Sequence, residues 1–267
     1  MVIHEFGNEN ERVMLMFPCA AEPWDAFEDA AKLLAARYRV VLVTPDGHTP
    51  GEGTDFVSVE KTVDDAVAWL KAHGIVRLDA LYGMSMGGGM AMHLLAWDKF
   101  PVKRVLIDAG TAPYTYPKWV CKLIGVRDYL EMKLAVRSRR VTEAAFPPER
   151  FTPEGCDPVQ VYDGVMAFLR TLSNKTIWNV FWSANNYSVP DTPRGRAELL
   201  FWVGADEWSS RFRDLKWARG YFPNMRVRTI PRMMHGEYVM IHPKDFVQDA
   251  LAYFEDGATQ EDEEEKR

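Results

Sequence analysis

The strongest chemical signal in the sequence is the pentapeptide Gly83-Met84-Ser85-Met86-Gly87. It follows a short apolar run and opens a helical pattern, which is the strand–turn–helix setting of a nucleophile elbow. Such a turn is strained and needs small residues on both sides of the serine, and the two glycines supply them. The helix N-terminus behind the serine favours developing negative charge. We therefore predict that Ser85 is a catalytic nucleophile.

A serine nucleophile needs a neighbouring base, and the chain contains six histidines. Two of them, His235 and His242, lie beyond the last apolar run of the sequence. His235 sits in a loop and is followed by Gly236, which permits an unusual backbone turn. His242 precedes Pro243 and is typical of the start of a final helix. We predict that His235 is the general base.

A base of this kind is usually oriented by a carboxylate, and three candidates are present. Asp206 and Glu207 are adjacent in the loop after the apolar run at residues 199–203, and Asp108 ends the run that begins at residue 102. Because adjacent residues leaving a strand point in different directions, we expect only one of Asp206 and Glu207 to reach the imidazole. The residues alone leave all three candidates open.

The oxyanion of an acyl-transfer intermediate needs two backbone N–H donors. One is expected from Met86, the residue after the nucleophile. The other is expected from the loop after the apolar run at residues 13–17. Within that loop Ala20 is the preferred donor and Cys19 the alternative.

The elements that must position these residues alternate along the chain. Short apolar runs occupy residues 13–17, 40–43, 78–82, 102–107, 199–203 and 227–230. Helical patterns lie between and after them at residues 24–38, 59–73, 86–97, 209–221 and 243–254. This alternation predicts an α/β fold with a parallel sheet that is buried on both faces beneath crossover helices.

The alternation stops between residues 111 and 196, which show helical and aromatic patterns but no convincing strand. Ligands bind at the carboxyl ends of the strands in open α/β sheets, and a helical insertion should lie above those ends. We therefore expect residues 1–110 and 197–256 to form the catalytic core and residues 111–196 to form a helical lid. Residues 257–267 are expected to be an acidic, disordered tail.

Composition narrows the classes of function. The chain of 267 residues is 47% apolar and has a net charge of -6, with no basic patch, so no nucleic-acid partner is expected. No apolar stretch is long enough for a membrane span. Three cysteines without CxxC spacing predict neither a disulfide framework nor a zinc site, and they fit a reducing cytoplasm. We predict a cytoplasmic protein with no metal and no cofactor.

The elbow at Ser85, the acid loop, the His235 loop and the insertion together resemble the α/β-hydrolase family, in its lid-bearing serine esterase-like branch. The resemblance extends over residues 13–254 and includes Asp46-Gly47-His48, where the family often has an Asp-x-Gly turn. It implies an α/β-hydrolase fold, with a mostly parallel central sheet flanked by helices and a helical lid insertion.

The resemblance also bears on the acid and on the oxyanion loop. In this family the acid commonly lies three residues after the glycine that ends its strand. Counted from Gly204, that position is Glu207, which favours Glu207 over the other two carboxylates. The family's usual His-Gly pair in the oxyanion loop is Pro18-Cys19 in this sequence, and this is its main departure from the pattern.

These residues indicate a serine hydrolase that cleaves a carboxylic ester or thioester of a small apolar acyl group through an acyl-enzyme. Two alternatives on the same fold are a ligand-binding protein without hydrolytic activity and an acyltransferase. The complete set of candidate triad residues argues against the first, because a pure binder needs no base. The sequence leaves the physiological substrate, the leaving group and the oligomeric state open.

Overall fold

Seven strands form one sheet in the order β1-β3-β2-β4-β5-β6-β7 in the computed structural model, which describes residues 1–256. All neighbouring pairs are parallel except β1 with β3. The strands are β1 (Val2–Phe6), β2 (Val13–Phe17), β3 (Arg39–Thr44), β4 (Leu78–Met84), β5 (Val102–Asp108), β6 (Glu198–Gly204) and β7 (Arg226–Ile230). The expected acidic tail, residues 257–267, lies outside the described residues.

The antiparallel edge strand β1 is the one strand that the apolar runs did not indicate. It pairs with β3 in a register that places Phe6 opposite Val40. Its side chains are only half-buried, and His4 and Glu5 interrupt its apolar residues, so it has no continuous apolar run. An edge strand needs fewer apolar residues than a central strand, because it has a neighbouring strand on one side only and is less buried.

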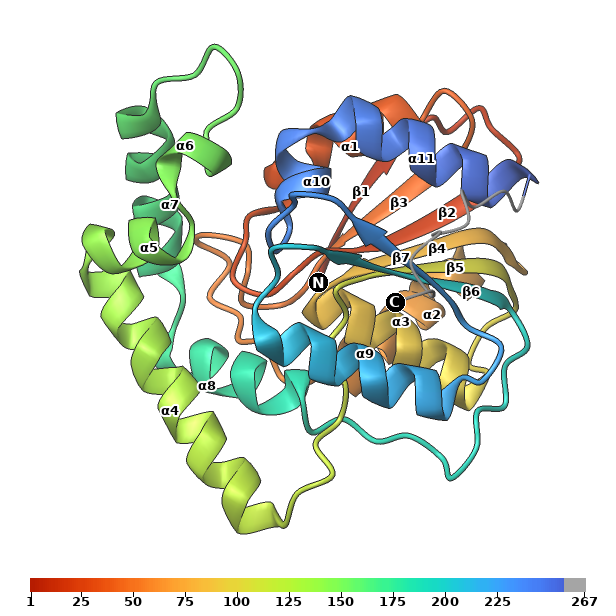
Figure 1. Ribbon diagram of the computed structural model, residues 1–267. Coiled ribbons are helices and arrows are strands. Elements are labelled where there is room, and N and C mark those ends of the chain that lie inside the picture. Colours follow the sequence, from red (N-terminus) through yellow and green to blue (C-terminus); the bar gives the residue numbers. More distant parts are fainter. Residues whose placement is uncertain (257–267) are drawn as a thin grey trace.

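Helices cover both faces of the sheet (Figure 1). One face carries α1 (Glu28–Leu34) and α11 (Pro243–Asp256), and the other carries α2 (Val59–Ala72), α3 (Met86–Trp97) and α9 (Ser209–Tyr221). Successive strand residues point to opposite faces, so each central strand contributes side chains to the apolar cores on both faces of the sheet. In β6, for example, Phe201 packs on the α3 side and Trp202 on the α11 side.

Two helical details differ from the sequence pattern. The helix expected at residues 24–38 is a 3-10 helix, η1 (Trp24–Phe27), followed by the short helix α1. The loop that contains His235 leads directly into α10 (Glu237–Ile241), a short helix that the pattern did not indicate. Five residues are too few for an amphipathic period to show in the sequence.

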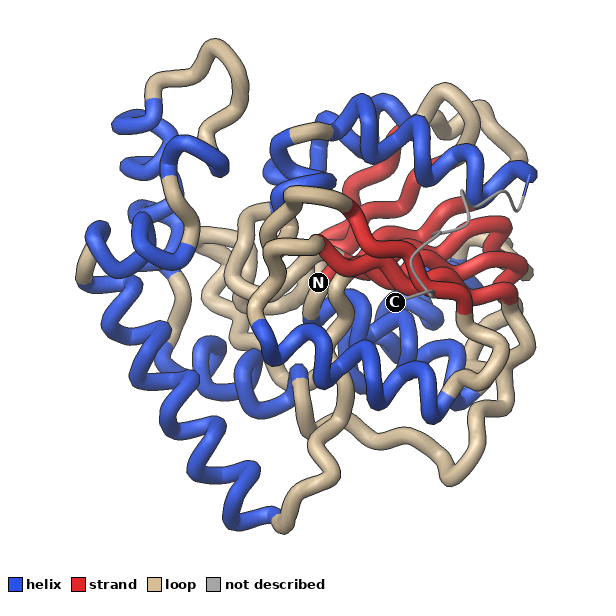
Figure 2. The backbone as a smooth tube through the Cα atoms, in the orientation of Figure 1, coloured by secondary structure: helices blue, strands red, loops and turns tan. Residues whose placement is uncertain are grey.

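The segment at residues 111–196 contains five helices, and every regular element described within it is helical (Figure 2). They are α4 (Lys118–Arg137), α5 (Arg139–Ala145), α6 (Pro148–Phe151), α7 (Pro158–Thr171) and α8 (Asn174–Ala184). This helical insertion has a small core of its own around Met166, Phe168 and Ile177. It is tied to the core, because Thr176 and Ser183 of α8 accept hydrogen bonds from the backbone N–H groups of Phe56, before α2, and Val59, the first residue of α2.

Phe246 of α11 tests the packing of the α11 face. Its fully buried ring lies 5.1 Å from the Tyr82 ring and 5.8 Å from the Trp202 ring, measured between centroids. Phe246→Ala should lower the free energy of unfolding by about 3–5 kcal/mol, because it removes buried apolar area and leaves a cavity. Urea denaturation measures this change. The control is Leu33→Ala at an exposed position of α1, and an equally small loss in both variants would contradict the packing described.

Candidate active site

Ser85 occupies a strained turn between β4 and α3. Its backbone has φ +54° and ψ -117°, a conformation that costs a residue with a side chain free energy and that clusters at functional sites. A Cβ at Gly83 would overlap the carbonyl of Gly87, and a Cβ at Gly87 would overlap the carbonyl of Phe17. Both glycines are therefore required. The turn is fixed from behind by a 2.8 Å hydrogen bond from the Ser85 N–H to the carbonyl of Asp108.

His235 and Glu207 form a buried pair. The Nδ1 atom of His235 lies 3.0 Å from Oε2 of Glu207. The second carboxylate oxygen of Glu207 accepts a 3.2 Å hydrogen bond from the N–H of Gly204, so both oxygens have partners. The Trp208 ring stacks on the imidazole, with 5.2 Å between the ring centroids. The carboxylate favours the tautomer with its proton on Nδ1, and the stacked indole helps to fix the tilt of the ring.

Asp206 points away from this pair. Its side chain is 47% exposed and forms a 2.9 Å ion pair with Arg150. The side chains of the two adjacent acids therefore point in different directions, as expected for neighbouring residues that leave a strand. Glu207 contacts the imidazole, and Asp206 faces the helical insertion.

Asp108 is buried at the end of β5, and its hydrogen-bond partner is Tyr82, whose hydroxyl donates to it over 2.9 Å. Burial, and then the nearby charge of Glu207, raise the pKa of Asp108 to about 7, while the hydrogen bond from Tyr82 acts in the opposite direction. Asp108 is thus close enough to Glu207 for the two charges to interact, but its side chain accepts its hydrogen bond from Tyr82.

The loop after β2 lies against the first turn of α3, because the carbonyls of Phe17 and Pro18 occupy the space where a Cβ of Gly87 would be. Met86 is the first residue of α3, and its N–H is one of the donors that a helix cannot satisfy internally. Ala20 is half-buried in this loop, and Cys19 is buried. Burial raises the pKa of the Cys19 thiol well above its usual range, which disfavours a reactive thiolate.

The buried His48 side chain stabilises the same loop through two hydrogen bonds. Its Nε2 lies 3.3 Å from the N–H of Ala21, and its Nδ1 lies 3.2 Å from the carbonyl of Asp46. Burial lowers the pKa of His48 to about 4, so the ring is neutral near pH 7, accepts from Ala21 and donates to Asp46. Ala21 has φ +57°, and this hydrogen bond helps to keep that left-handed turn in place.

The sequence reasoning missed Arg150, which joins the helical insertion to both loops of the site. From α6 its guanidinium donates to both oxygens of Glu237, at 3.1 and 2.7 Å, and to Asp206. Glu237 is buried and also accepts a 2.8 Å hydrogen bond from the N–H of Met234. Glu237 stands two residues after His235, which was an available signal, whereas nothing in the sequence around Arg150 sets it apart.

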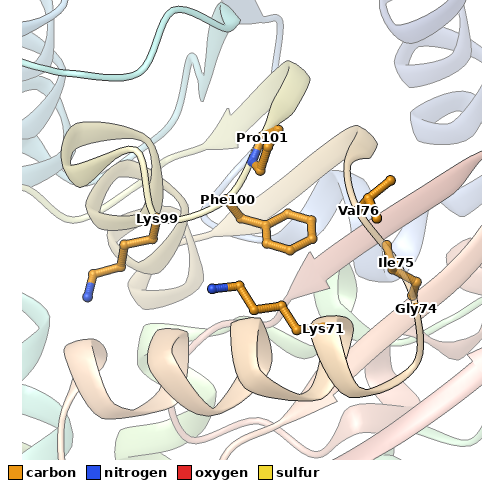
Figure 3. Close-up of a pocket in the computed structure, with 7 residues that line it drawn as sticks. All are labelled: Lys71, Gly74, Ile75, Val76, Lys99, Phe100 and Pro101. Carbon is orange, nitrogen blue, oxygen red and sulfur yellow. The ribbon is translucent and has the colours of Figure 1, made fainter.

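A hollow of about 370 Å³ lies at the other end of the sheet (Figure 3). It is lined where α2 and α3 end and where β4 and β5 begin, by Lys71, Gly74, Ile75, Val76, Lys99, Phe100 and Pro101. Ser85 lies at the carboxyl end of β4, where ligands bind in open α/β sheets. The hollow is therefore separate from the candidate active site.

In residues 1–256, no group of three or more His, Cys, Asp or Glu side chains is arranged to hold a metal ion. Over the same residues, no helix combines the length and apolar character needed to cross a membrane.

The raised pKa of Asp108 predicts a pH-dependent stability. The native state keeps this proton up to about pH 7, whereas the unfolded chain releases it near pH 4, so folding takes up a proton between these values. The stability that the protonated carboxyl contributes is complete below about pH 4 and is lost as the pH rises through about 7. The stability of Asp108→Asn relative to the unmodified protein should therefore rise between about pH 4 and pH 7 and level off above that.

Urea denaturation at a series of pH values measures this difference. Asp206→Asn is the matched control, because it makes the same chemical change at an exposed carboxylate. Parallel stability profiles for Asp108→Asn and the unmodified protein would contradict a buried, protonated Asp108.

Comparison with known proteins identifies the family of the chain. A sequence model of the Alpha/beta hydrolase family matches residues 14–250, and no curated protein matches the chain. The fold is similar to a thermophilic esterase from Thermogutta terrifontis, with 14% identity, a TM-score of 0.71 and coverage of 97% of this chain and 94% of that one. It is also similar to an enol-lactonase from Burkholderia xenovorans LB400, with 15% identity, a TM-score of 0.70 and coverage of 94% and 95%.

At such low identities the structural likeness is one of fold, and it agrees with the seven-stranded, mostly parallel sheet flanked by helices. The expected α/β-hydrolase fold is confirmed. Because the family match covers most of its length, the chain belongs to the alpha/beta hydrolase family.

Proposed function

We propose that the protein is a serine hydrolase that cleaves a carboxylic ester or thioester with a small apolar acyl group. The observation that carries the proposal is the buried His235–Glu207 pair, together with the strained Ser85 turn in the same fold. A buried imidazole held by a carboxylate serves as a general base, and a pure binding protein has no use for it. Catalysis is therefore favoured over binding alone.

The chemistry follows from which histidine nitrogen is engaged. Nδ1 faces Glu207, so the Nδ1–H donates to the carboxylate and leaves Nε2 free to accept a proton. Ser85 Oγ attacks the carbonyl carbon of the substrate while His235 Nε2 takes the hydroxyl proton. Glu207 stabilises the imidazolium that results. The backbone N–H groups of Met86 and Ala20, with Cys19 as the alternative to Ala20, would bind the oxyanion of the tetrahedral intermediate.

Collapse of the intermediate breaks the bond between the carbonyl carbon and the leaving oxygen or sulfur. His235 returns its proton to that leaving group, and the acyl group stays on Ser85 Oγ. Water then attacks the acyl-enzyme with His235 again acting as base. The free acid departs, and Ser85 regains its proton. An acyltransferase would differ only in the acceptor that replaces water, so product analysis separates the two.

The surroundings of His235 support an apolar acyl group. Trp208 covers one face of the imidazole and is partly exposed. The Phe146 ring from the helical insertion lies 5.7 Å from the Trp208 ring, and Phe151 lies behind it. These aromatic rings offer an apolar surface where the insertion meets the site, which fits the role of a lid. Met84 and Met86, on either side of Ser85, are buried and pack in the cores on the two faces of the sheet.

The similar structures point to the same bond type. Two of them are named an esterase and an enol-lactonase, names that both refer to carboxylic esters. For this chain, that class of bond fits a serine nucleophile with a histidine base.

Ser85→Ala should lower kcat on aryl esters by roughly 10⁴- to 10⁶-fold while leaving the fold intact, because the attacking oxygen is removed. Hydrolysis of p-nitrophenyl esters of increasing acyl length measures the loss and also gives the acyl preference. Ser209→Ala, at an exposed position at the start of α9, is the matched control and should stay near full activity. Retention of more than about a tenth of the activity in Ser85→Ala would rule out Ser85 as the nucleophile.

The three carboxylates near the site give a second test. Glu207→Gln should lower kcat on the order of 10⁴-fold, because the histidine loses its orienting acceptor and its tautomer. Asp206→Asn and Asp108→Asn should cost far less, because these side chains bind Arg150 and Tyr82 instead. Kinetics of the three variants, each checked for folding by circular dichroism, make the comparison. Near-native kcat in Glu207→Gln with collapse in either aspartate variant would transfer the role to that aspartate.

A further inference from the structure

Helix α4 is the longest helix of the insertion and runs along its outer side (Figure 1). It carries a row of large apolar side chains that are between 39% and 68% exposed. The row consists of Trp119, Leu123, Val126, Leu130 and Leu134, and we refer to it as the α4 stripe.

The stripe is narrow and continuous. At 3.6 residues per turn, the five side chains fall within an arc of about 80° and extend for about 22 Å along the helix. The opposite side of α4 holds it to the protein, because Cys121 is buried and Gly125 packs against Trp182 of α8. The stripe therefore does not hold the insertion together. A soluble helix normally keeps its apolar side inward, so apolar residues on both sides of α4 leave one side without a partner.

One border of the stripe is basic. By the same helical geometry, Lys122 and Lys133 lie along one side, whereas Arg127 on the other side is paired with both acids of the helix. Arg137 continues the stripe at its C-terminal end. The helix has five basic and two acidic residues, whereas the whole chain has a net charge of -6. Positive charge is thus concentrated around the one extended apolar row on α4.

The acidic residues of α4 offset the charge of Arg127 but not that of its other basic residues. Asp128 is mostly covered, and its carboxylate bonds Arg127. Glu131 lies 3.7 Å from the same guanidinium. Both acids are therefore engaged by a single arginine, and the remaining lysines and arginine of the helix are in excess.

We propose that the α4 stripe docks on an anionic phospholipid surface, with the apolar side chains in the boundary between headgroups and acyl chains and the basic side chains on the phosphates. An apolar row with Trp and Leu, bordered by Lys and Arg, is the pattern of helices that lie in a membrane interface. Basic residues beside such a row are attracted by the negative surface potential of anionic lipids.

Charge decides between this occupant and a second copy of the chain. Antiparallel pairing of two α4 stripes would bring the Lys122–Lys133 border of one helix against the same border of the other, and like charges at such a contact are repulsive. An anionic lipid surface meets the same borders with opposite charge. The inference is independent of the serine chemistry, since it concerns a surface that no proposed triad residue reaches.

The test is co-sedimentation of the full chain with vesicles. One set contains phosphatidylcholine with an equal amount of phosphatidylserine, and the other contains phosphatidylcholine alone. The protein should sediment with the anionic vesicles and much less with the neutral ones, and added salt should weaken binding. Leu123→Glu combined with Leu130→Glu should lower partitioning by roughly tenfold or more, because both side chains would leave the acyl boundary.

A matched control replaces exposed apolar residues elsewhere, Leu33→Glu combined with Val76→Glu, and should bind as the unmodified protein does. Circular dichroism and ester hydrolysis report that each variant is folded. Failure of the unmodified protein to bind anionic vesicles would overturn the proposal, and so would equal binding by the α4 variant. A dimer detected by light scattering that the α4 variant abolishes, without vesicle binding, would assign the stripe to a second copy instead.

Discussion

The hydrogen bond between Glu207 and His235 joins the loops that follow two neighbouring strands, β6 and β7. A buried carboxylate is stable only if its oxygens have donors, and here the imidazole and the Gly204 N–H supply them. The loops are bound to each other through their backbones as well, because Asp206 N–H donates to the carbonyl of Met233 over 3.0 Å. A Cβ at Gly204 would overlap that same carbonyl, so the close approach depends on glycine. The geometry of the proposed base is therefore set by the sheet.

The helical insertion is coupled to this arrangement through Arg150. Its guanidinium binds Glu237 behind the histidine loop and Asp206 beside Glu207, so one residue of α6 spans both loops. Glu237 is buried, and removal of the arginine would leave its charge without a cation. The aromatic contact between Phe146 and Trp208 adds an apolar link at the same junction. Movement of the insertion would thus shift the loops that hold His235 and Glu207, and through these contacts a proposed lid could affect the catalytic groups.

The sequence predicted those parts of the structure that local chemistry determines. Six of the seven strands follow apolar runs, and the Ser85 turn follows from glycines that the backbone leaves no room to replace. β1 was missed because a half-buried edge strand can hold His4 and Glu5. Asp206 and Glu207 could not be separated by residue type, since their difference is the direction in which each side chain leaves the strand. Arg150 could not be found at all, because its role depends on contacts with residues more than fifty positions away.

Activation of Ser85 by His235 is tested most directly by a fluorophosphonate probe, which forms a covalent adduct preferentially with an activated serine hydroxyl. Intact-mass measurement followed by peptide mapping locates the adduct. We expect a single adduct on Ser85 in the unmodified protein, and strongly slowed labelling in His235→Ala because no base remains to take the proton. An adduct on another residue, no adduct at all, or labelling of His235→Ala at the unmodified rate would contradict this activation.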